Sequence, residues 1–260
     1  MQKLQGRVAV ITGGTRGIGR GIAEAYLDEG AKVVITGRSA EKGQHALDEI
    51  KMPERTHFVA GDVRVQADVE RMVDEAVEHF GAIDIFVSNA GGSDGFALVH
   101  ELTNEAWNNA MDLNVNSLFW GARRSLQHML PNGWGRIISV SSVEGKQATK
   151  GMVSHYITGK HAIHGLIKAI AFEYGPSGIT SNAICPGAVE TDLMKGPGRE
   201  AAEAAGLTYD EFLQGYAEES MIKRLNTVEE VAAMAVLLSS DVGGGITGSL
   251  VNVDGGSSSW

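Results

Sequence analysis

The 260-residue sequence has one cysteine, five prolines and no long uninterrupted hydrophobic run. A single cysteine excludes a disulfide framework within the chain and any zinc or iron–sulfur site built from cysteines. No stretch approaches the roughly 18 consecutive apolar residues that a transmembrane helix needs, so no membrane partner is expected. These absences predict a globular chain that is stabilised by its own hydrophobic core.

Positive charge is also scarce. The sequence has 22 Lys and Arg against 32 Asp and Glu, and 22 − 32 gives a net charge of −10. Phosphates repel such a chain, so neither nucleic acid nor an acidic membrane surface is an expected partner. The first residues, MQKLQGRVAVITGG, lack the pattern of a signal peptide. The sequence therefore predicts a cytoplasmic protein.

Short runs rich in β-branched residues alternate with longer helical stretches. Most of the runs are continuously apolar, which is typical of strands covered on both faces. They span residues 7–12, 32–36, 56–60, 83–88, 136–141, 180–185 and 249–253. The helical stretches span residues 17–29, 40–51, 66–80, 104–130, 152–175 and 227–239. This alternation predicts an α/β fold with a single doubly wound Rossmann-type domain over residues 1–260, and helices on both faces of a parallel sheet.

One segment, at about 188–226, interrupts this rhythm. A long insertion at this place favours a substrate loop over a second domain. Its apolar residues predict an apolar inner face, and the other expected pocket walls are residues that follow strand ends. We therefore expect a ketone or cyclic alcohol of modest size as the substrate, in a pocket walled by Gly92–Gly95, Glu144, Gln147, Val189, Leu193, Met194 and residues 195–222.

Two helical stretches have almost no charge. Residues 113–122 carry none, and residues 152–175 carry only Lys160, Lys168 and Glu173. A helix that is apolar nearly all round must be buried on more than one side, and the sheet can cover only one. We predict a homo-oligomer, with a homotetramer favoured. Burial within a larger monomer core is the alternative.

A glycine-rich loop, TGGTRGIG at 12–19, joins the first predicted strand to the first predicted helix. Glycines let backbone N–H groups approach a pyrophosphate, and a helix N-terminus attracts that anion. At this point of a βαβ unit the loop favours a dinucleotide over a loop that merely closes a turn. The G-K-[ST] ending of ATP-binding loops is absent. The expected contacts come from Gly13, Thr15, Arg16, Gly17, Ile18 and Gly19.

The second predicted strand ends in Gly37-Arg38. NAD-binding folds usually place a carboxylate here that binds the ribose 2′-OH. No acid is present, and Arg38 offers donors suited to a phosphate, with Arg16 on the same side. The sequence therefore predicts NADP(H). A solvated surface role for Arg38 is the alternative.

Tyr156 and Lys160 are four residues apart on a predicted helix, so both side chains project from one face. The polar strand end Ser139–Ser142 directly precedes this helix. A tyrosine at such a strand end could deliver a proton to a carbonyl oxygen. A lysine one turn away is expected to lower the tyrosine pKa from its usual value near 10. A packed tyrosine with a solvated lysine is the alternative.

At this point the chain resembles the short-chain dehydrogenase/reductase family. The matching pieces are TGGTRGIG at 12–19, Asp62-Val63, SNAG at 88–91, Asn114 in DLNV, SSV at 141–143, YITGK at 156–160 and PGAVET at 186–191. The resemblance covers nearly the whole chain. It implies a seven-stranded sheet and hydride transfer between a nicotinamide and an alcohol/carbonyl pair.

The resemblance also implies residue roles. Tyr156 would be the general acid/base, and Lys160 would bind the nicotinamide ribose and depress the Tyr156 pKa. Ser142 would bind the substrate oxygen, and Asn114 would anchor a water in the proton relay. Further cofactor contacts would come from Asp62 and Val63 at the adenine, from Asn89, Ala90 and Gly91 at the adenosine ribose, and from Pro186, Gly187, Val189 and Thr191 at the carboxamide and pyrophosphate.

Three functions compete at this stage. The first is an NADPH-dependent carbonyl reductase. The second is a 3-oxoacyl thioester reductase or an NAD-dependent alcohol dehydrogenase of the same fold. The third is a non-catalytic cofactor-binding scaffold, which the complete catalytic set disfavours. No metal site is expected, because His161 and His164 lack a third ligand.

Overall fold

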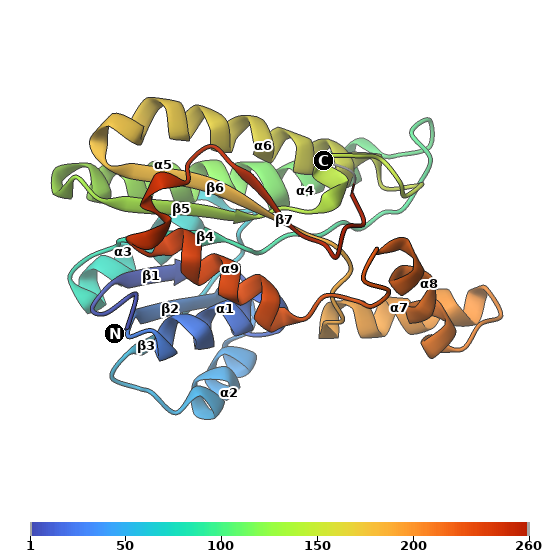
Figure 1. Cartoon of the computed structure of the whole chain (residues 1–260), viewed down its shortest axis with the longest axis horizontal. Coiled ribbons are helices and arrows are strands. Elements are labelled where there is room, and N and C mark those ends of the chain that lie inside the picture. The colour runs from blue at the N-terminus through green and yellow to red at the C-terminus, as the bar shows by residue number, and fades with distance from the viewer. Residues whose placement is uncertain (1, 259–260) are drawn as a thin grey trace.

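The computed structural model describes residues 2–258, except for the side chains of residues 192, 193 and 197. Seven strands form one parallel sheet in the order β3-β2-β1-β4-β5-β6-β7, which confirms the predicted doubly wound fold (Figure 1). The chain moves outward from β1 in one direction and then returns to add β4 on its other side. The strands are β1 (Val8–Ile11), β2 (Lys32–Gly37), β3 (Thr56–Ala60), β4 (Ile85–Ser88), β5 (Gly135–Val140), β6 (Ile179–Pro186) and β7 (Leu250–Val253).

Helices cover both faces of the sheet. One face packs on α1 (Gly17–Asp28), α2 (Ala40–Ile50) and α9 (Val228–Ser239). The other packs on α3 (Gln66–Phe80), α5 (Ser117–Met129) and α6 (Ser154–Tyr174). Each face has its own hydrophobic cluster, which explains why the strands are apolar on both sides. None of the helices in the described part of the chain has the length and hydrophobicity needed to cross a bilayer.

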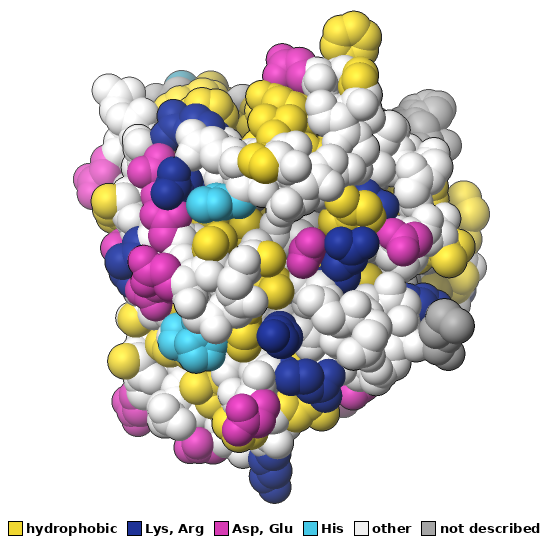
Figure 2. Space-filling model, turned by 90° about the vertical axis from the view of Figure 1, so that its left-hand side faces the viewer, with side chains coloured by type: hydrophobic (Ala, Val, Ile, Leu, Met, Phe, Trp, Pro, Cys, Tyr) yellow, Lys and Arg dark blue, Asp and Glu magenta, His cyan; other side chains and the backbone are white. Residues whose placement is uncertain are grey.

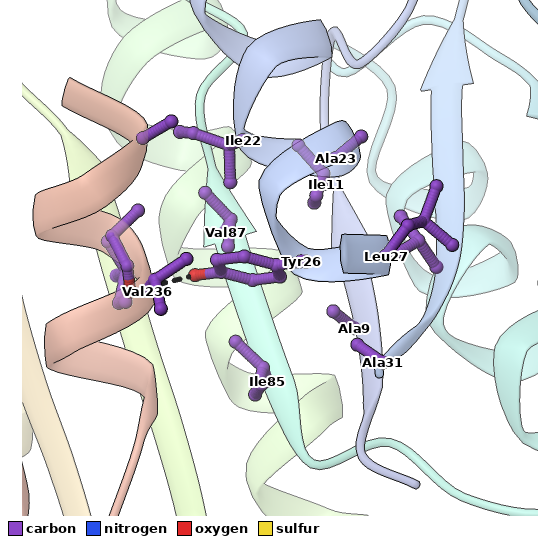
Figure 3. Close-up of a cluster of buried hydrophobic side chains, with 14 of the residues drawn as sticks. Ala9, Ile11, Ile22, Ala23, Tyr26, Leu27, Ala31, Ile85, Val87 and Val236 are labelled. Carbon is purple, nitrogen blue, oxygen red and sulfur yellow. Dashed lines mark hydrogen bonds between the residues drawn. The ribbon is translucent and has the colours of Figure 1, made fainter. Parts of the chain in front are cut away.

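Tyr26 of α1 joins two helices within the first cluster (Figure 3). The side chain is fully buried. Its hydroxyl donates to the Ala235 carbonyl of α9 at 3.2 Å and lies 2.5 Å from the Ser239 Oγ. Burial raises the pKa of this phenol, so it stays neutral and serves as a hydrogen-bonding group inside an apolar layer.

Replacing Tyr26 by Phe should lower the free energy of unfolding by about 1–3 kcal/mol, because the buried Ser239 hydroxyl loses its partner. Urea denaturation measures the change. The double variant Tyr26→Phe/Ser239→Ala serves as the control and should be more stable than Tyr26→Phe alone, since no unpaired hydroxyl remains. A single variant as stable as the wild type would show that the bond between the two hydroxyls does not stabilise the fold.

The stretch 104–130, predicted as one helix, is interrupted. Helix α4 (Asn104–Met111) passes into a π-helical turn over Asp112–Asn116 before α5 begins. The turn adds a residue without ending the helix, so hydrophobic periodicity alone cannot reveal it. It carries Asn114, which is 1% exposed.

The segment 188–226 contains two helices, α7 (Asp192–Ala204) and α8 (Tyr209–Glu219). Gly206 separates them with a φ of +70°, and a capping box of Thr208 and Glu211 begins α8. Both helices project beyond the carboxyl ends of the strands (Figure 1).

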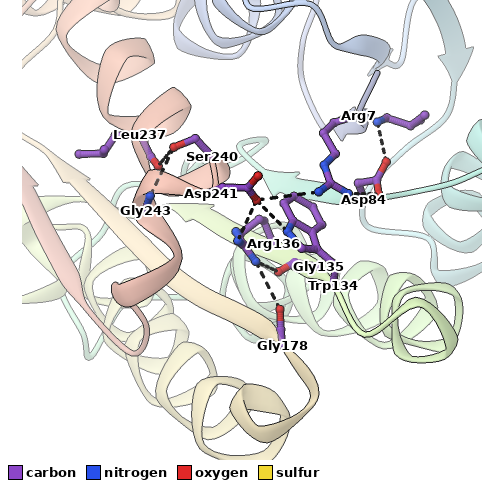
Figure 4. A network of polar contacts seen from close by, with 11 residues as sticks. Arg7, Asp84, Trp134, Gly135, Arg136, Gly178, Leu237, Ser240, Asp241 and Gly243 are labelled. Atoms are coloured by element: carbon purple, nitrogen blue, oxygen red, sulfur yellow. Dashed lines mark hydrogen bonds and ion pairs between the residues drawn. The ribbon is translucent and has the colours of Figure 1, made fainter. Parts of the chain in front are cut away.

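A polar network connects the amino-terminal ends of the strands, at the end of the sheet opposite to α7 and α8 (Figure 4). The guanidinium groups of Arg7 and Arg136 lie 3.5 and 4.1 Å from the centroid of the Trp134 ring. The Trp134 Nε1 donates to Asp241 at 3.0 Å, and Arg7 pairs with Asp84 at 3.1 Å. These contacts connect the starts of β1 and β5 to the end of α9. The face of the molecule away from α7 and α8 mixes acidic, basic and hydrophobic side chains (Figure 2).

Candidate functional site

The candidate site lies where the strand order reverses, at the carboxyl ends of β1 and β4. The buried Thr12 hydroxyl accepts hydrogen bonds from the backbone N–H groups of Asn89 and Ala90, both at 3.0 Å. The Asn89 Nδ2 in turn donates to the Thr12 carbonyl at 2.9 Å. The structure therefore places the predicted residues Asn89 and Ala90 against the glycine loop. Thr12 begins the predicted glycine-loop motif, but no role is predicted for it from the sequence, although its place at a strand end was a usable signal.

The N-terminus of α1 is free to receive an anion. Arg16 occupies the N-cap without a side-chain cap, and the first turn holds no acid. By contrast, Ser39, Thr208 and Thr227 cap α2, α8 and α9 with their side chains. The uncapped amides of α1 fit the pyrophosphate of a dinucleotide.

The glycine loop is packed as closely as glycine allows. A Cβ added to Gly19 would lie 2.3 Å from the Asn89 Nδ2 and 2.5 Å from the Gly13 carbonyl oxygen. A Cβ on Gly17 would lie 3.4 Å from the Thr191 Cβ, so the loop after β6 also borders the glycine loop. We call these two loops and the N-terminus of α1 the cradle. Within that loop, Gly187 donates to the Val253 carbonyl at 3.1 Å. The strand end Pro186 pairs with Val253, and Val189 is buried.

Two arginines lie near the glycine loop, Arg16 within it and Arg38 directly after β2. Arg16 and Arg38 are exposed, and neither forms an ion pair with a described residue. A Cβ on Gly37 would lie 3.2 Å from the Thr15 Cγ2, so the end of β2 contacts the glycine loop. Two free guanidinium groups fit the 2′-phosphate of NADP(H).

Arg64, which the sequence motifs do not single out, holds Asp62. Its Nε lies 3.1 Å from both carboxylate oxygens, and its second terminal nitrogen lies 2.6 Å from one of them. This hydrogen-bonded pair lowers the pKa of Asp62, and the charge of Arg38 adds to the effect. The predicted adenine contact Asp62 is therefore fixed by a neighbour two residues away, next to the buried Val63.

The four predicted catalytic residues come together beside this cradle. Ser142 lies near enough to Tyr156 to lower the pKa of that phenol, and its Oγ accepts from the Glu144 N–H at 3.1 Å. The Lys160 Nζ donates to the Val140 carbonyl at 3.0 Å and lies 5.4 Å from the centroid of the Tyr156 ring.

Gly91 joins Asn114 to this group. A Cβ on Gly91 would lie 2.9 Å from the Asn114 Oδ1 and 3.1 Å from the Lys160 Nζ, so only glycine fits between them. The Asn114 amide is held by Gly92 and Ala110, with its Nδ2 donating to their carbonyls at 2.8 and 2.9 Å. The π-helical turn thus presents Asn114 to the lysine.

The pKa of Tyr156 is raised in this structure, whereas the sequence predicts a lowered one. Burial raises the pKa of Tyr156, the Ser142 hydrogen bond opposes that rise, and the charge of Glu144 adds to it. Lys160 is itself buried, which lowers its pKa to about 8. Desolvation therefore outweighs the attraction between ammonium and phenolate on which the expectation rested.

A buried polar cluster lies directly behind the catalytic residues. The His164 Nε2 lies 2.8 Å from the Ser141 Oγ and 3.5 Å from the Cys185 Sγ. Burial lowers the pKa of His164 to about 4 and raises that of Cys185 to about 11, so both groups are neutral near pH 7. His155 is also fully buried, and its Nε2 contacts the Asp94 carbonyl at 2.8 Å. It holds the loop after β4.

Acid should destabilise the fold through His164. Its pKa is about 4 in the folded chain and 6.5 in the unfolded chain, so between these values the unfolded state binds the extra proton. Stability is therefore full above about pH 6.5 and falls as the pH drops toward 4. By pH 4.5 the loss should reach about 2–3 kcal/mol.

Urea denaturation at several pH values measures this loss. His164→Gln should flatten the pH dependence over that range, whereas His100→Gln, at an exposed site on another segment, should leave it unchanged. An unaltered slope in His164→Gln would show that another group is responsible.

A pocket of about 500 Å³ opens beside Ser142. Its walls come from the loop before α6, the loop after β6, helix α8 and the segment after β7. The predicted wall residues Glu144 and Gln147 line it, but Gly92–Gly95 and Val189 do not. Leu207 and Met221 are 46% and 75% exposed, and Tyr216 is the large hydrophobic residue of the 195–222 segment that lines the pocket. The side chain of Leu193 lies outside the described residues.

Comparison with known proteins agrees with this geometry. A family model described as enoyl-(acyl carrier protein) reductase matches residues 13–258. The chain is 36% identical to 3beta-hydroxysteroid dehydrogenase 2 of Eggerthella lenta, over 99% of this chain and 96% of that protein. The chain belongs to the short-chain dehydrogenase/reductase family.

Other members of this family are equally similar over their whole length. A 3-oxoacyl-(acyl-carrier-protein) reductase of Aquifex aeolicus is 34% identical, over 98% of both proteins. The crystal structure of an actinorhodin polyketide ketoreductase variant with NADPH superposes with a TM-score of 0.92 and 31% identity, over 98% of both chains. As a short-chain dehydrogenase/reductase, the chain is an oxidoreductase that acts on a ketone/alcohol pair.

Proposed function

We propose that this short-chain dehydrogenase/reductase is an NADP(H)-dependent carbonyl reductase or alcohol dehydrogenase with Tyr156 as its general acid/base. The proposal rests on one observation. Four side chains lie together beside the uncapped N-terminus of α1, namely those of Ser142, Tyr156, Lys160 and Asn114. That arrangement puts a proton donor next to a cradle for a dinucleotide.

The bound cofactor supplies a hydride to the carbonyl carbon. The chain supplies the proton and the orientation. The Ser142 hydroxyl binds the carbonyl oxygen, and the Tyr156 hydroxyl gives its proton to that oxygen as the alcohol forms. The raised pKa of Tyr156 keeps the phenol protonated before the reaction. Lys160, whose pKa is about 8, carries a positive charge near pH 7 and stabilises the phenolate that results.

Tyr156→Phe should lower kcat by roughly 10²- to 10⁴-fold, because general acid catalysis is lost. Steady-state oxidation of NADPH with a reducible ketone measures kcat. NADPH binding, followed by fluorescence titration, should stay within about twofold of wild type, since the cradle is unchanged. Tyr174→Phe on the same helix serves as the control and should keep full activity. A wild-type kcat in Tyr156→Phe would overturn the catalytic assignment.

The preference for NADP(H) rests on the end of β2. Arg38 and Arg16 are exposed guanidinium groups without ion-pair partners among the described residues, and no acid occupies the end of the strand. The actinorhodin ketoreductase structure that matches this chain contains NADPH.

Gly37→Asp should reverse this preference. A Cβ at Gly37 would point at Thr15, so the new carboxylate would lie beside the glycine loop and repel a 2′-phosphate. We expect the KM for NADPH to rise about 10- to 100-fold, and the KM for NADH to fall. Arg38→Gln, which removes a donor and adds no charge, should raise the KM for NADPH only. Equal use of both cofactors by the wild-type enzyme would refute the role of the arginines.

We also propose that the enzyme is a cytoplasmic homotetramer formed from one domain. Phe119 of α5 and Phe172 of α6 are 43% and 87% exposed on the helices that the sequence predicts to meet a second subunit. Reduction of a 3-oxoacyl thioester is a second candidate activity, because a relative of that name is 34% identical to this chain.

A further inference from the structure

Most of the residues that line the pocket beside Ser142 have polar side chains, although carbon atoms make up the larger share of the lining surface. Of its 15 lining residues, 11 have polar or charged side chains, and the other four are Val143, Gly187, Ala188 and Tyr216. Enzyme pockets are usually lined by apolar groups with a few polar ones. The 11 polar side chains give this pocket more hydrogen-bonding partners than usual, which favours a ligand with several polar groups.

Both cations of this pocket are already paired. The Lys150 Nζ lies 2.5 Å from a Glu219 carboxylate oxygen and 4.6 Å from the centroid of the Tyr216 ring. Arg224 makes a two-pronged contact with the carboxylate of Glu230, at 2.6 and 3.1 Å. The lining residues include two cations and three carboxylates, so an anionic ligand would find net repulsion and no free cation among them.

Glu144 is the lining carboxylate that is free to bind a ligand. Its side chain is buried and accepts hydrogen bonds from the N–H and the hydroxyl of Thr149, which fix its orientation. No cation of the described chain pairs with it. A carboxylate has about four acceptor positions, so those not taken by Thr149 remain for donors on a ligand. Asp254 differs, because Gly256 and Ser258 already occupy its oxygens at 2.5–3.0 Å.

The polar lining residues come from several segments of the chain. Glu144 and Gln147 lie before α6, Asn226 lies after α8 and Asp254 lies after β7. A ligand that hydrogen-bonds to more than one of these segments must carry more than one polar group.

We propose that the substrate is an uncharged carbonyl compound or alcohol with several additional hydroxyl groups, and that Glu144 accepts a hydrogen bond from one of them. The inference rests on the proposed function, because Ser142 is the proposed partner of the reacting oxygen and also lines this pocket. The Glu144 N–H donates to the Ser142 Oγ at 3.1 Å, so Glu144 adjoins the residue that is proposed to bind the reacting oxygen.

Steady-state oxidation of NADPH tests the proposal on three kinds of carbonyl compound. The first are uncharged polyhydroxy ketones, namely dihydroxyacetone, a ketohexose and a keto-inositol. The second is cyclohexanone, which lacks hydroxyl groups, and the third is acetoacetate, which is anionic. We expect the highest kcat/KM with a polyhydroxy ketone and the lowest with acetoacetate.

Glu144→Gln should lower kcat/KM for the polyhydroxy ketone about 10- to 100-fold, mainly through KM, because a charge-assisted hydrogen bond is lost. Its kcat/KM for cyclohexanone should change much less, because only the effect of the Glu144 charge on Tyr156 is lost with that substrate. Glu218→Gln, on an exposed side chain of α8 outside this pocket, is the matched control and should behave as wild type. Gln147→Leu provides a second pocket variant if Glu144→Gln does not fold, and it should weaken only the polyhydroxy ketones.

The outcomes separate the two proposals. A preference for cyclohexanone or acetoacetate, or an equal loss on all ketones in Glu144→Gln, overturns the polyhydroxy inference and leaves the carbonyl reductase intact. Absence of turnover with every carbonyl, and with the corresponding alcohols and NADP⁺, contradicts the proposed function. In that case, calorimetric titration of the NADPH complex with the keto-inositol shows whether the pocket binds a polyhydroxy compound. The inference is supported if the keto-inositol binds and if Glu144→Gln weakens this binding. It is overturned if the keto-inositol does not bind.

Discussion

The parallel sheet, buried on both faces, is the constraint on which the rest of this molecule depends. Because helices cover both sides, polar side chains can gather only at the strand ends. All seven strands run in the same direction, so their carboxyl ends meet at one edge. The glycine loop after β1, the Asn89 turn after β4 and Ser142 after β5 are therefore neighbours in space, although more than 120 positions separate the first from the last. The catalytic geometry follows from strand direction before any side-chain detail is considered.

Much of this arrangement could be predicted from the sequence because its signals are local. Apolar runs predict the strands, and the TGGTRGIG loop marks the start of α1. The spacing of Tyr156 and Lys160 places both on one face of α6. The elements that escaped prediction depend on contacts between distant segments or on burial. Thr12 and Arg64 act through partners that sequence spacing does not show, and the buried group of Ser141, His164 and Cys185 forms only when β5, β6 and α6 pack together.

Electrostatic properties follow less directly from the sequence than the fold does. A lysine near a tyrosine predicts a more acidic phenol, but burial of both groups reverses that direction here. The character of the pocket wall is also hard to predict from the sequence. The apolar residues of the 188–226 segment predict an apolar wall. Several of them face solvent instead, and charged side chains of α8 and of the loop before α6 reach the pocket. Composition of a segment does not reveal which side of its helices faces inward.

The π-helical turn at Asp112–Asn116 has a consequence for the whole second helical layer. Each residue of a regular helix advances the side chains by about 100°, so the additional residue sets the rotation of everything that follows it. Removing one residue there would restore a uniform helix and swing Leu118, Ala122 and Leu126 off the sheet together. The widened turn therefore fixes the rotation of α5 against the sheet, and it also places Asn114 next to Lys160.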